Sequence, residues 1–192
     1  MTPPSLSLAD MRATAARLAP HVLRTPVALL HGRHVDPLLA GMASVHLKLE
    51  LFQRTGTFKA RGALNAVMAL DAAARERGIT AASAGNHAVA AAFAARAAGT
   101  TARLMVQSSA NPVRLALTRS YGAEVILAPD GPAAFAGAEQ LVRDEGRTMI
   151  HPFEGPLTSL GTATLGLELS FFPTPNVADR ERSAAGVVTV WV

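Results

Sequence analysis

Between residues 79 and 150, short apolar runs alternate with longer helical segments, and this pattern constrains the fold more than any other feature of the chain. The apolar runs cover residues 79–83, 102–106, 123–127 and 148–150, and the helical segments cover residues 87–98, 112–121 and 133–145. Strands and helices that alternate at this spacing favour an open, mostly parallel, doubly wound α/β sheet. Gly99, Gly122 and Gly146 each stand where a helix must end, so we expect left-handed helix caps there.

The flanking regions predict further elements around this sheet. Residues 7–10 have the spacing of a capping box, which predicts a first helix that ends near Leu18. The alternating run over 45–50 predicts a strand, followed by a turn over 55–62 and a helix over 63–77. Beyond the sheet we expect a helix over 159–169, a loop over 172–185 and a last strand over 186–192.

Composition excludes several classes of protein. Hydrophobic residues make up 49% of the chain, enough for a buried core, and there is no cysteine for disulfides or thiolate metal sites. No apolar stretch reaches the roughly 18 residues of a membrane span, and the start lacks the layout of a secretory signal, so we expect a cytoplasmic protein without membrane contact. The net charge of +4 comes from scattered arginines with few aromatic residues, which argues against nucleic acid as a partner.

Lysine is rare among the basic residues. Of 18 lysines and arginines, only Lys48 and Lys59 are lysines, and a primary amine can condense with an aldehyde where a guanidinium cannot. Lys59 lies in the segment TGTFKARG, beside an aromatic residue at a strand-to-helix turn where a cofactor can reach the backbone. An ordinary solvated lysine is the alternative for this position.

A second candidate segment, SAGNHA over residues 83–88, lies between an expected strand and an expected helix. Its small residues let a ligand approach the backbone, and the start of the helix favours an anion. Asn86 offers a neutral amide to a ring hydroxyl. A tight turn capped by Ser83 or Asn86 is the alternative interpretation.

Together these segments resemble the fold-type II pyridoxal 5'-phosphate (PLP) enzymes, in particular the serine/threonine dehydratase and serine racemase branch. The resemblance is carried by LKLELFQRTGTFKARGALNAV, SAGNHA, NPVRLALTRSYGAEVIL and HPFEGPLTSLGTATLGLEL. It implies a fold like that of the tryptophan synthase β subunit and assembly into a homo-oligomer. It also implies that a small α/β domain, residues 64–152, is set into a large PLP domain, of which residues 1–63 and 153–192 form an incomplete part.

The resemblance implies a role for each matching residue. Lys59 would hold PLP as a Schiff base and would remove the Cα proton of an amino acid substrate. Phe58 would pack against the cofactor ring and Asn86 would bond its 3'-hydroxyl. The substrate carboxylate would be bound by three residues of the second segment, Ser83, Gly85 and His87. The implied reaction is β-elimination from L-threonine or L-serine to a 2-oxo acid and ammonia. No metal site is expected from the residues, because no carboxylate or further histidine completes a set of ligands with His31 and His34.

Departures from the family pattern leave alternatives open. Ala84 stands where serine racemases carry a serine, which favours elimination over racemisation because alanine has no proton to exchange. We expect the glycine-rich loop that binds the PLP phosphate to lie beyond Val192, so an inactive product remains an alternative, as does a β-replacement synthase or a racemase. Glu50 either orients the lysine segment or pairs with Arg54 or Arg61. His151 is interpreted as a structural or cleft-lining residue.

Overall fold

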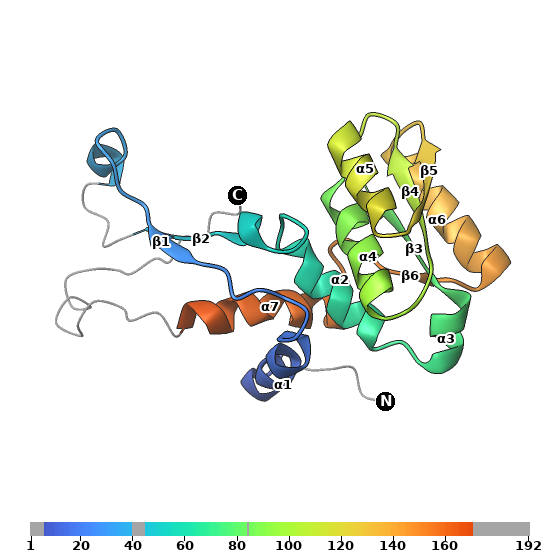
Figure 1. Ribbon diagram of the computed structural model, residues 1–192, viewed down its shortest axis with the longest axis horizontal. Coiled ribbons are helices and arrows are strands. Elements are labelled where there is room, and N and C mark those ends of the chain that lie inside the picture. The colour runs from blue at the N-terminus through green and yellow to red at the C-terminus, as the bar shows by residue number, and fades with distance from the viewer. Residues whose placement is uncertain (1–5, 40–44, 84, 171–192) are drawn as a thin grey trace.

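A four-stranded parallel sheet forms the centre of the computed structural model, which describes residues 6–39, 45–83 and 85–170. The strand order is β5-β4-β3-β6, with the bounds β3 Ile79–Ser83, β4 Ala102–Gln107, β5 Glu124–Ala128 and β6 Thr148–Met149. All three pairings are parallel, so the α/β fold expected from the sequence is confirmed (Figure 1).

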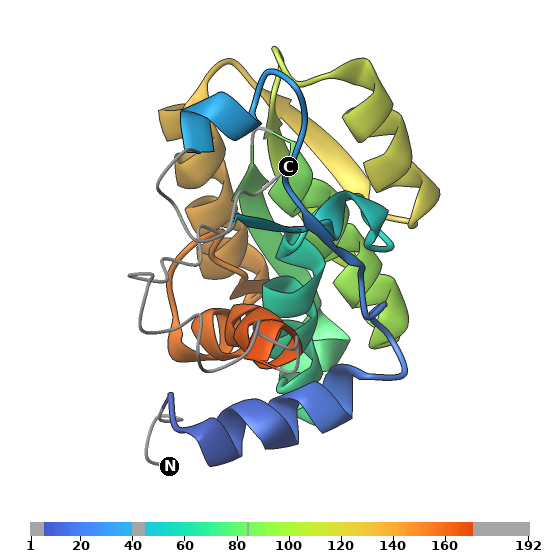
Figure 2. The same cartoon turned by 90° about the vertical axis from the view of Figure 1, so that its left-hand side faces the viewer.

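Helices cover both faces of this sheet. Helices α4 (Asn86–Ala97) and α5 (Pro112–Ser120) lie on one face, and α6 (Gly131–Glu145) lies on the other, as the two views show (Figures 1 and 2). Small side chains let α4 approach the sheet closely, because six of its alanines are buried: Ala88, Ala90, Ala91, Ala92, Ala94 and Ala95. The main core therefore lies between α4 and the sheet and extends to α2.

A second group of helices packs beside the sheet. Helix α2 (Lys59–Met68) contacts both α4 and α7 (Pro156–Ser170), and α1 (Leu8–Leu18) packs on α7. The backbones of α2 and α7 meet at two glycines: a Cβ on Gly62 would lie 2.9 Å from the carbonyl oxygen of Thr158, and one on Gly161 would lie 2.8 Å from Asn65 Cβ. The start of α2 is thus held against a helix almost a hundred residues further along the chain.

The segment before α2 contains a small ladder that the sequence only half predicts. Strand β2 (His46–Lys48) confirms the expected strand but is shorter, because a 3-10 helix, η2 (Glu50–Phe52), begins at Glu50. Its antiparallel partner β1 (Val27–Leu29) was not expected. A further 3-10 helix, η1 (Asp36–Leu39), lies between the two strands.

Two local expectations need correction and one is confirmed. The single helix over 63–77 is wrong: α2 ends at Met68, and α3 (Ala72–Arg77) begins after Asp71, whose side chain accepts a 2.8 Å hydrogen bond from Ala74 N. The turn over 55–62 is also too long, since the helix already begins at Lys59. The expected left-handed caps are confirmed; Gly146, for example, has φ 64° and ends α6.

The proposed domain boundaries stay a prediction. All four strands of the parallel sheet fall within residues 64–152, although α2 crosses the proposed boundary at residue 63. The loop over 172–185, the strand over 186–192 and Ala84 lie outside the described residues. Within the described ranges, none of the helices combines the length and the apolar character that crossing a bilayer requires.

Candidate active site

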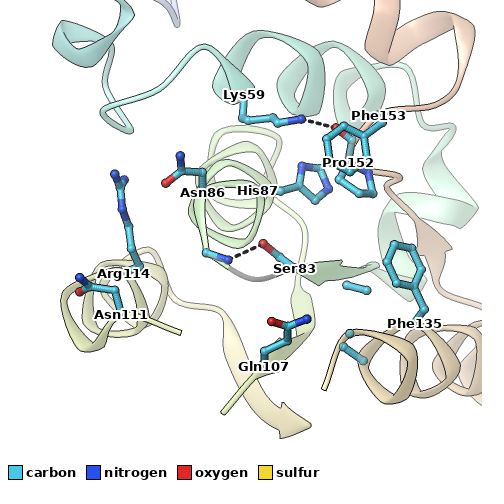
Figure 3. Close-up of a pocket in the computed structure, with 14 residues that line it drawn as sticks. Lys59, Ser83, Asn86, His87, Gln107, Asn111, Arg114, Phe135, Pro152 and Phe153 are labelled. Carbon is cyan, nitrogen blue, oxygen red and sulfur yellow. Dashed lines mark hydrogen bonds between the residues drawn. The ribbon is translucent and has the colours of Figure 1, made fainter. Parts of the chain in front are cut away.

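The candidate site lies where the carboxyl ends of β3 and β6 meet. Strands β4 and β5 follow β3 on one side, whereas β6 returns to its other side, so the strand order reverses here. In open α/β sheets, ligands bind in the crevice outside such a reversal point. A cavity of about 530 Å³ occupies it, lined by Ser83 at the end of β3, by Pro152 and Phe153 after β6, and by the start of α4 (Figure 3).

Lys59 reaches this cavity from the first turn of α2. Its Nζ donates a 2.6 Å hydrogen bond to the carbonyl oxygen of Pro152 and lies 4.0 Å from the centroid of the Phe153 ring (Figure 3). Burial lowers the pKa of the Lys59 amine, because desolvation disfavours the charged form. A larger fraction of the amine is therefore neutral, and so nucleophilic, than in a solvated lysine.

The segment between β3 and α4 forms a tight turn that ends at the start of a helix. Ser83 Oγ accepts hydrogen bonds from Gly85 N at 2.9 Å and from Ala88 N at 3.0 Å, which caps the first turn of α4. Gly85 has φ 155° and ψ −85°, a conformation that glycine adopts without a steric penalty. Asn86 is exposed and begins the helix. The amides of a first helical turn face outward and attract anions.

His87 is buried and its ring is already engaged by the protein. Its Nε2 lies 2.8 Å from the carbonyl oxygen of Ile150, so Nε2 carries the proton and donates. Burial lowers the pKa of His87 to about 4, and the positive charges of Lys59 and His151 act in the same direction. At neutral pH the ring is uncharged, so any contribution to carboxylate binding would come from the backbone amide rather than from an imidazolium.

The structure separates the expected site residues into two groups. Lys59, Ser83, Gly85, Asn86 and His87 all line the first cavity. Phe58 lines a second cavity of about 720 Å³, which Lys59 and Phe153 also border and which α7 closes on one side. The rings of Phe58 and Phe153 both lie near Lys59 Nζ, with centroids at 5.2 Å and 4.0 Å. Lys59 therefore stands between the two cavities.

A buried network of ion pairs holds the helix that carries Lys59. Arg61, two residues further along α2, donates from Nε to Glu50 Oε2 at 2.9 Å and from Nη1 to Glu168 Oε1 at 2.7 Å. Lys48 Nζ completes it with a 2.6 Å contact to Glu168 Oε2. Burial alone would lower the pKa of Arg61, but its hydrogen bonds to Glu50 and Glu168 outweigh that effect and raise it. Of the alternatives for Glu50, the structure shows the pairing with Arg61.

His151 has a structural contact of the kind expected. Its Nδ1 accepts hydrogen bonds from Phe153 N at 3.3 Å and Glu154 N at 2.9 Å, so the ring organises the turn after β6. This turn presents the Pro152 carbonyl to Lys59 and the Phe153 ring to the cavity.

Several cavity residues were missed from the sequence. Arg114 and Asn111 come from α5 and the residue before it, Gln107 ends β4, and Phe135 lies in α6. Asn111 and Arg114 lie in a segment that carries the family resemblance, but nothing in the sequence placed them at the cavity, because these residues converge only when the sheet forms. No acidic side chain is among the described residues that line the cavity, whereas Lys59 and Arg114 are both basic. The cavity is therefore suited to an anionic ligand.

The residues present fit a phosphate-bearing aldehyde cofactor better than a metal ion. A partly buried amine of lowered pKa, an exposed amide at Asn86 and a helix start meet at one cavity. Within the part of the chain that the structure describes, no three histidine, cysteine, aspartate or glutamate side chains gather in a way that could hold a metal.

Comparison with known proteins agrees with this chemistry. Residues 18–190 match the family described as pyridoxal-phosphate dependent enzyme. Among curated proteins, the chain is 46% identical over 165 residues to phenylserine dehydratase of Ralstonia pickettii, covering 84% of this chain and 49% of the relative. It is 39% identical over 154 residues to L-threonine ammonia-lyase of Geobacter sulfurreducens, covering 80% and 37% respectively.

Solved structures show the same fold. Maize serine racemase superposes with a TM-score of 0.76 at 30% identity, over 85% of this chain and 49% of that one. The processed form of threonine deaminase isoform 2 from Solanum lycopersicum superposes with a TM-score of 0.74 at 27% identity, over 85% and 46%. The chain spans about half the length of the first of the curated relatives, and less of the second.

Proposed function

Since the chain belongs to the family of pyridoxal-phosphate dependent enzymes, we propose that it carries the lysine of a lyase that acts on a β-hydroxy α-amino acid such as L-threonine or L-serine. One observation carries this proposal: Lys59 Nζ, with its lowered pKa, lines the same cavity as the turn that begins at Ser83. The names of the relatives, which include a threonine ammonia-lyase and a phenylserine dehydratase, support a dehydratase.

Each site residue would have its own role in this reaction. Lys59 Nζ would bind the cofactor covalently and, once displaced by the substrate amine, would take the proton from Cα. Asn86 would donate from its amide to a cofactor oxygen, and Phe58 would pack against the cofactor from the second cavity. The turn of Ser83 and Gly85 and the amide of His87 would bind the substrate carboxylate at the start of α4.

PLP, when bound, supplies an electron sink for the negative charge that develops at Cα. The chain's own contribution is then geometry and proton transfer. Binding of the substrate carboxylate at α4 and of its amine beside Lys59 would fix the directions of two bonds of Cα. The Cα–H bond could then point at Lys59 Nζ. In the net reaction the hydroxyl leaves as water, water is taken up again in hydrolysis, and the products are a 2-oxo acid and ammonia.

Racemisation of serine is the second candidate, because maize serine racemase shares the fold at 30% identity. Ala84 weighs against it, since alanine has no acidic side-chain proton that could be returned to Cα. Conversion of L-serine to D-serine without ammonia release would favour racemisation over elimination. Homo-oligomeric assembly and a cytoplasmic location, which the family resemblance implies, belong to the same proposal.

Covalent labelling tests the proposal directly. The protein is mixed with PLP, reduced with borohydride and digested, and the modified peptide is identified by mass spectrometry. We expect the label on Lys59. Lys48 is the internal control, because it is 2% exposed and its Nζ is bonded to Thr25 O and Glu168. Equal labelling of both lysines, or a visible PLP band that survives in Lys59→Ala, would overturn the assignment.

Activity gives the second measurement. With PLP bound, L-threonine should yield 2-oxobutanoate and ammonia in equal amounts, and Lys59→Arg should abolish both, since a guanidinium keeps the charge but cannot condense with an aldehyde. If Lys59 is labelled but no ammonia is released, the proposal that Lys59 binds the cofactor stands and the proposal that the protein is a lyase is rejected.

A further inference from the structure

Arg114 brings a positive charge to the cavity that the mechanism proposed above does not use. It lies in the first turn of α5 and is half-buried, and Figure 3 shows it on the same side of the cavity as Asn86. Within the described ranges, none of the ion pairs includes Arg114. No carboxylate of those residues therefore neutralises its guanidinium.

The Arg114 side chain lies between the two segments that carry the expected site residues. Its Cγ would be 3.8 Å from a Cβ on Gly85, in the turn after β3. Its Nη1 would be 3.7 Å from a Cβ on Gly56, three residues before Lys59. Nη1 also donates a hydrogen bond of 3.4 Å to the carbonyl oxygen of Thr55. A hydrogen bond of that length is weak, so the guanidinium can turn to a better acceptor at little cost.

The helix that carries Arg114 is held against the lysine segment. Tyr121, the residue after α5, donates a 3.1 Å hydrogen bond from its hydroxyl to the carbonyl oxygen of Arg54. The Tyr121 ring also packs edge to face against Phe93 of α4, with the centroids 5.6 Å apart. The backbone of α5 is thus fixed next to both site segments, and the Arg114 side chain reaches the cavity from that fixed position.

A substrate carboxylate at the turn after β3 needs a positive charge that the turn does not supply. His87 is uncharged at neutral pH, because burial lowers its pKa to about 4. Lys59 lines the same cavity but would be bonded to the cofactor. Arg114 is then the permanent cation among the described residues that line the cavity, since a guanidinium stays protonated. Its planar fork also suits a two-pronged bond to a carboxylate.

We propose that Arg114 binds the α-carboxylate of the amino acid substrate, as the charged partner of the backbone amides in the turn of Ser83 and Gly85. The inference rests on the proposed function, which places the carboxylate at that turn. A ligand with a neutral group in place of the carboxylate should lose the contribution of Arg114. The phosphate of the cofactor is the other anion that Arg114 could contact, and separate measurements of substrate and cofactor binding distinguish the two.

The first measurement compares L-alanine with L-alaninamide, which differ only in the replacement of the carboxylate by a neutral amide. Neither has a hydroxyl group to eliminate. Each is titrated into the isotope-labelled 192-residue chain with PLP present, and the amide signals of Gly85 and Ala88 are followed by NMR. We expect alanine to bind roughly tenfold more tightly than alaninamide, and Arg114→Gln to remove most of that preference by weakening alanine alone. Arg114→Lys keeps the charge without the fork and should retain part of the preference.

Arg119→Gln is the matched control, because Arg119 lies in the same helix, is exposed and does not line the cavity. It removes the same charge and should keep the ratio of the two affinities. The second measurement is the borohydride-fixed PLP label on Lys59, which we expect to be unchanged in Arg114→Gln.

The inference is overturned if alanine binds no more tightly than alaninamide, or if Arg114→Gln keeps the ratio of the two affinities. A kept ratio together with a fall in PLP labelling would assign Arg114 to the cofactor phosphate instead. Ammonia release from threonine by Arg114→Gln with the wild-type KM rejects the inference and retains the proposed function. A preference for alanine that depends on Arg114, in a chain that releases no ammonia from threonine, supports the inference and rejects the lyase. If neither ligand binds, both are rejected.

Discussion

Arg61 and Glu50 form a two-pronged ion pair, in which Nε and Nη2 of the arginine each lie 2.9 Å from a carboxylate oxygen and both side chains are 1% exposed. Glu50 lies just after β2 and Arg61 lies in the first turn of α2, so the pair joins the small antiparallel ladder to the helix that carries Lys59. Charge in this buried network is balanced, with Lys48 and Arg61 opposite Glu50 and Glu168.

Removing Arg61 should therefore be costly. Arg61→Met leaves Glu50 buried without its guanidinium, and we expect the free energy of unfolding to fall by about 3–5 kcal/mol. Urea denaturation measures the change. Arg143→Met is the control, because Arg143 and Glu139 form an exposed pair at 3.8 Å, and its effect should be a small fraction of the first. Equal losses of unfolding free energy in the two variants would show that burial of the ion-pair network does not add to the stability of the fold.

The stability of the fold should depend on pH through His87. Its pKa in the folded chain is about 4 because of burial, below its ordinary value of 6.5, so the unfolded chain binds the proton first as the pH falls. The contribution of the neutral His87 ring to the free energy of unfolding is fully present above pH 6.5 and is lost as the pH falls from 6.5 to about 4. It amounts to roughly 3 kcal/mol.

His87→Gln removes the titration and keeps a donor for the Ile150 carbonyl. We expect its loss of unfolding free energy between pH 7 and pH 4.5 to be smaller than that of the wild type, as measured by urea titrations at both values. His31→Gln, at an exposed position, should keep the wild-type loss. Identical losses in His87→Gln and the wild type would mean that His87 is not held neutral by burial.

Close contact between α2 and α7 should make Gly161 intolerant of any side chain. A Cβ there would meet the carbonyl oxygen of Arg61 and would lie 2.9 Å from Gly62 Cα, so Gly161→Ala should destabilise the chain by about 1–3 kcal/mol. Gly166 lies in the same helix, and among the described residues no atom outside the backbone of that helix lies within 4 Å of its Cβ position. Gly166→Ala should be neutral or stabilising by up to about 1 kcal/mol. Thermal and urea unfolding of the two variants test the pair, and similar behaviour would contradict the packing described.

The role of Ser83 as a cap of helix α4 can be tested without a ligand, and so separately from any role in binding. Ser83→Ala removes the acceptor for Gly85 N and Ala88 N and should cost about 1 kcal/mol of unfolding free energy. Hydrogen exchange at the Ala88 amide should also become faster. Ser108→Ala is the control, because that exposed hydroxyl makes a long contact of 3.5 Å with Pro129 O, and it should change stability less. Unchanged exchange at Ala88 would argue that the cap is not formed in solution.

The sequence predicted the parallel sheet well because its signals are local. Apolar runs and glycines at helix ends, such as Gly146, repeat at regular spacing. The break at Asp71 was missed because the surrounding alanines and arginines favour helix on both sides of it. Strand β1 was missed because three residues carry too little periodicity.

Among the site residues, too, those in contiguous motifs were predicted, whereas those that only the fold brings together were missed. Lys59 and the segment from Ser83 to His87 are contiguous motifs, and the structure brings them to one cavity. Phe135 lies outside the segments that carry the family resemblance, whereas Arg114 and Phe153 lie inside them but had no role assigned, because only the order of the strands brings them to the cavity. Phe58 lines the neighbouring cavity, which Lys59 also borders, and the centroid of its ring lies 5.2 Å from Lys59 Nζ.

The position of Lys59 between two cavities has a consequence for chemical modification. A reagent can approach the amine from the side of Asn86 or from the side of Phe58 and α7. An amino acid that fills only the first side leaves the second route open. The degree to which a bound molecule shields Lys59 from an aldehyde thus reports which chamber it occupies, and full shielding requires both to be filled.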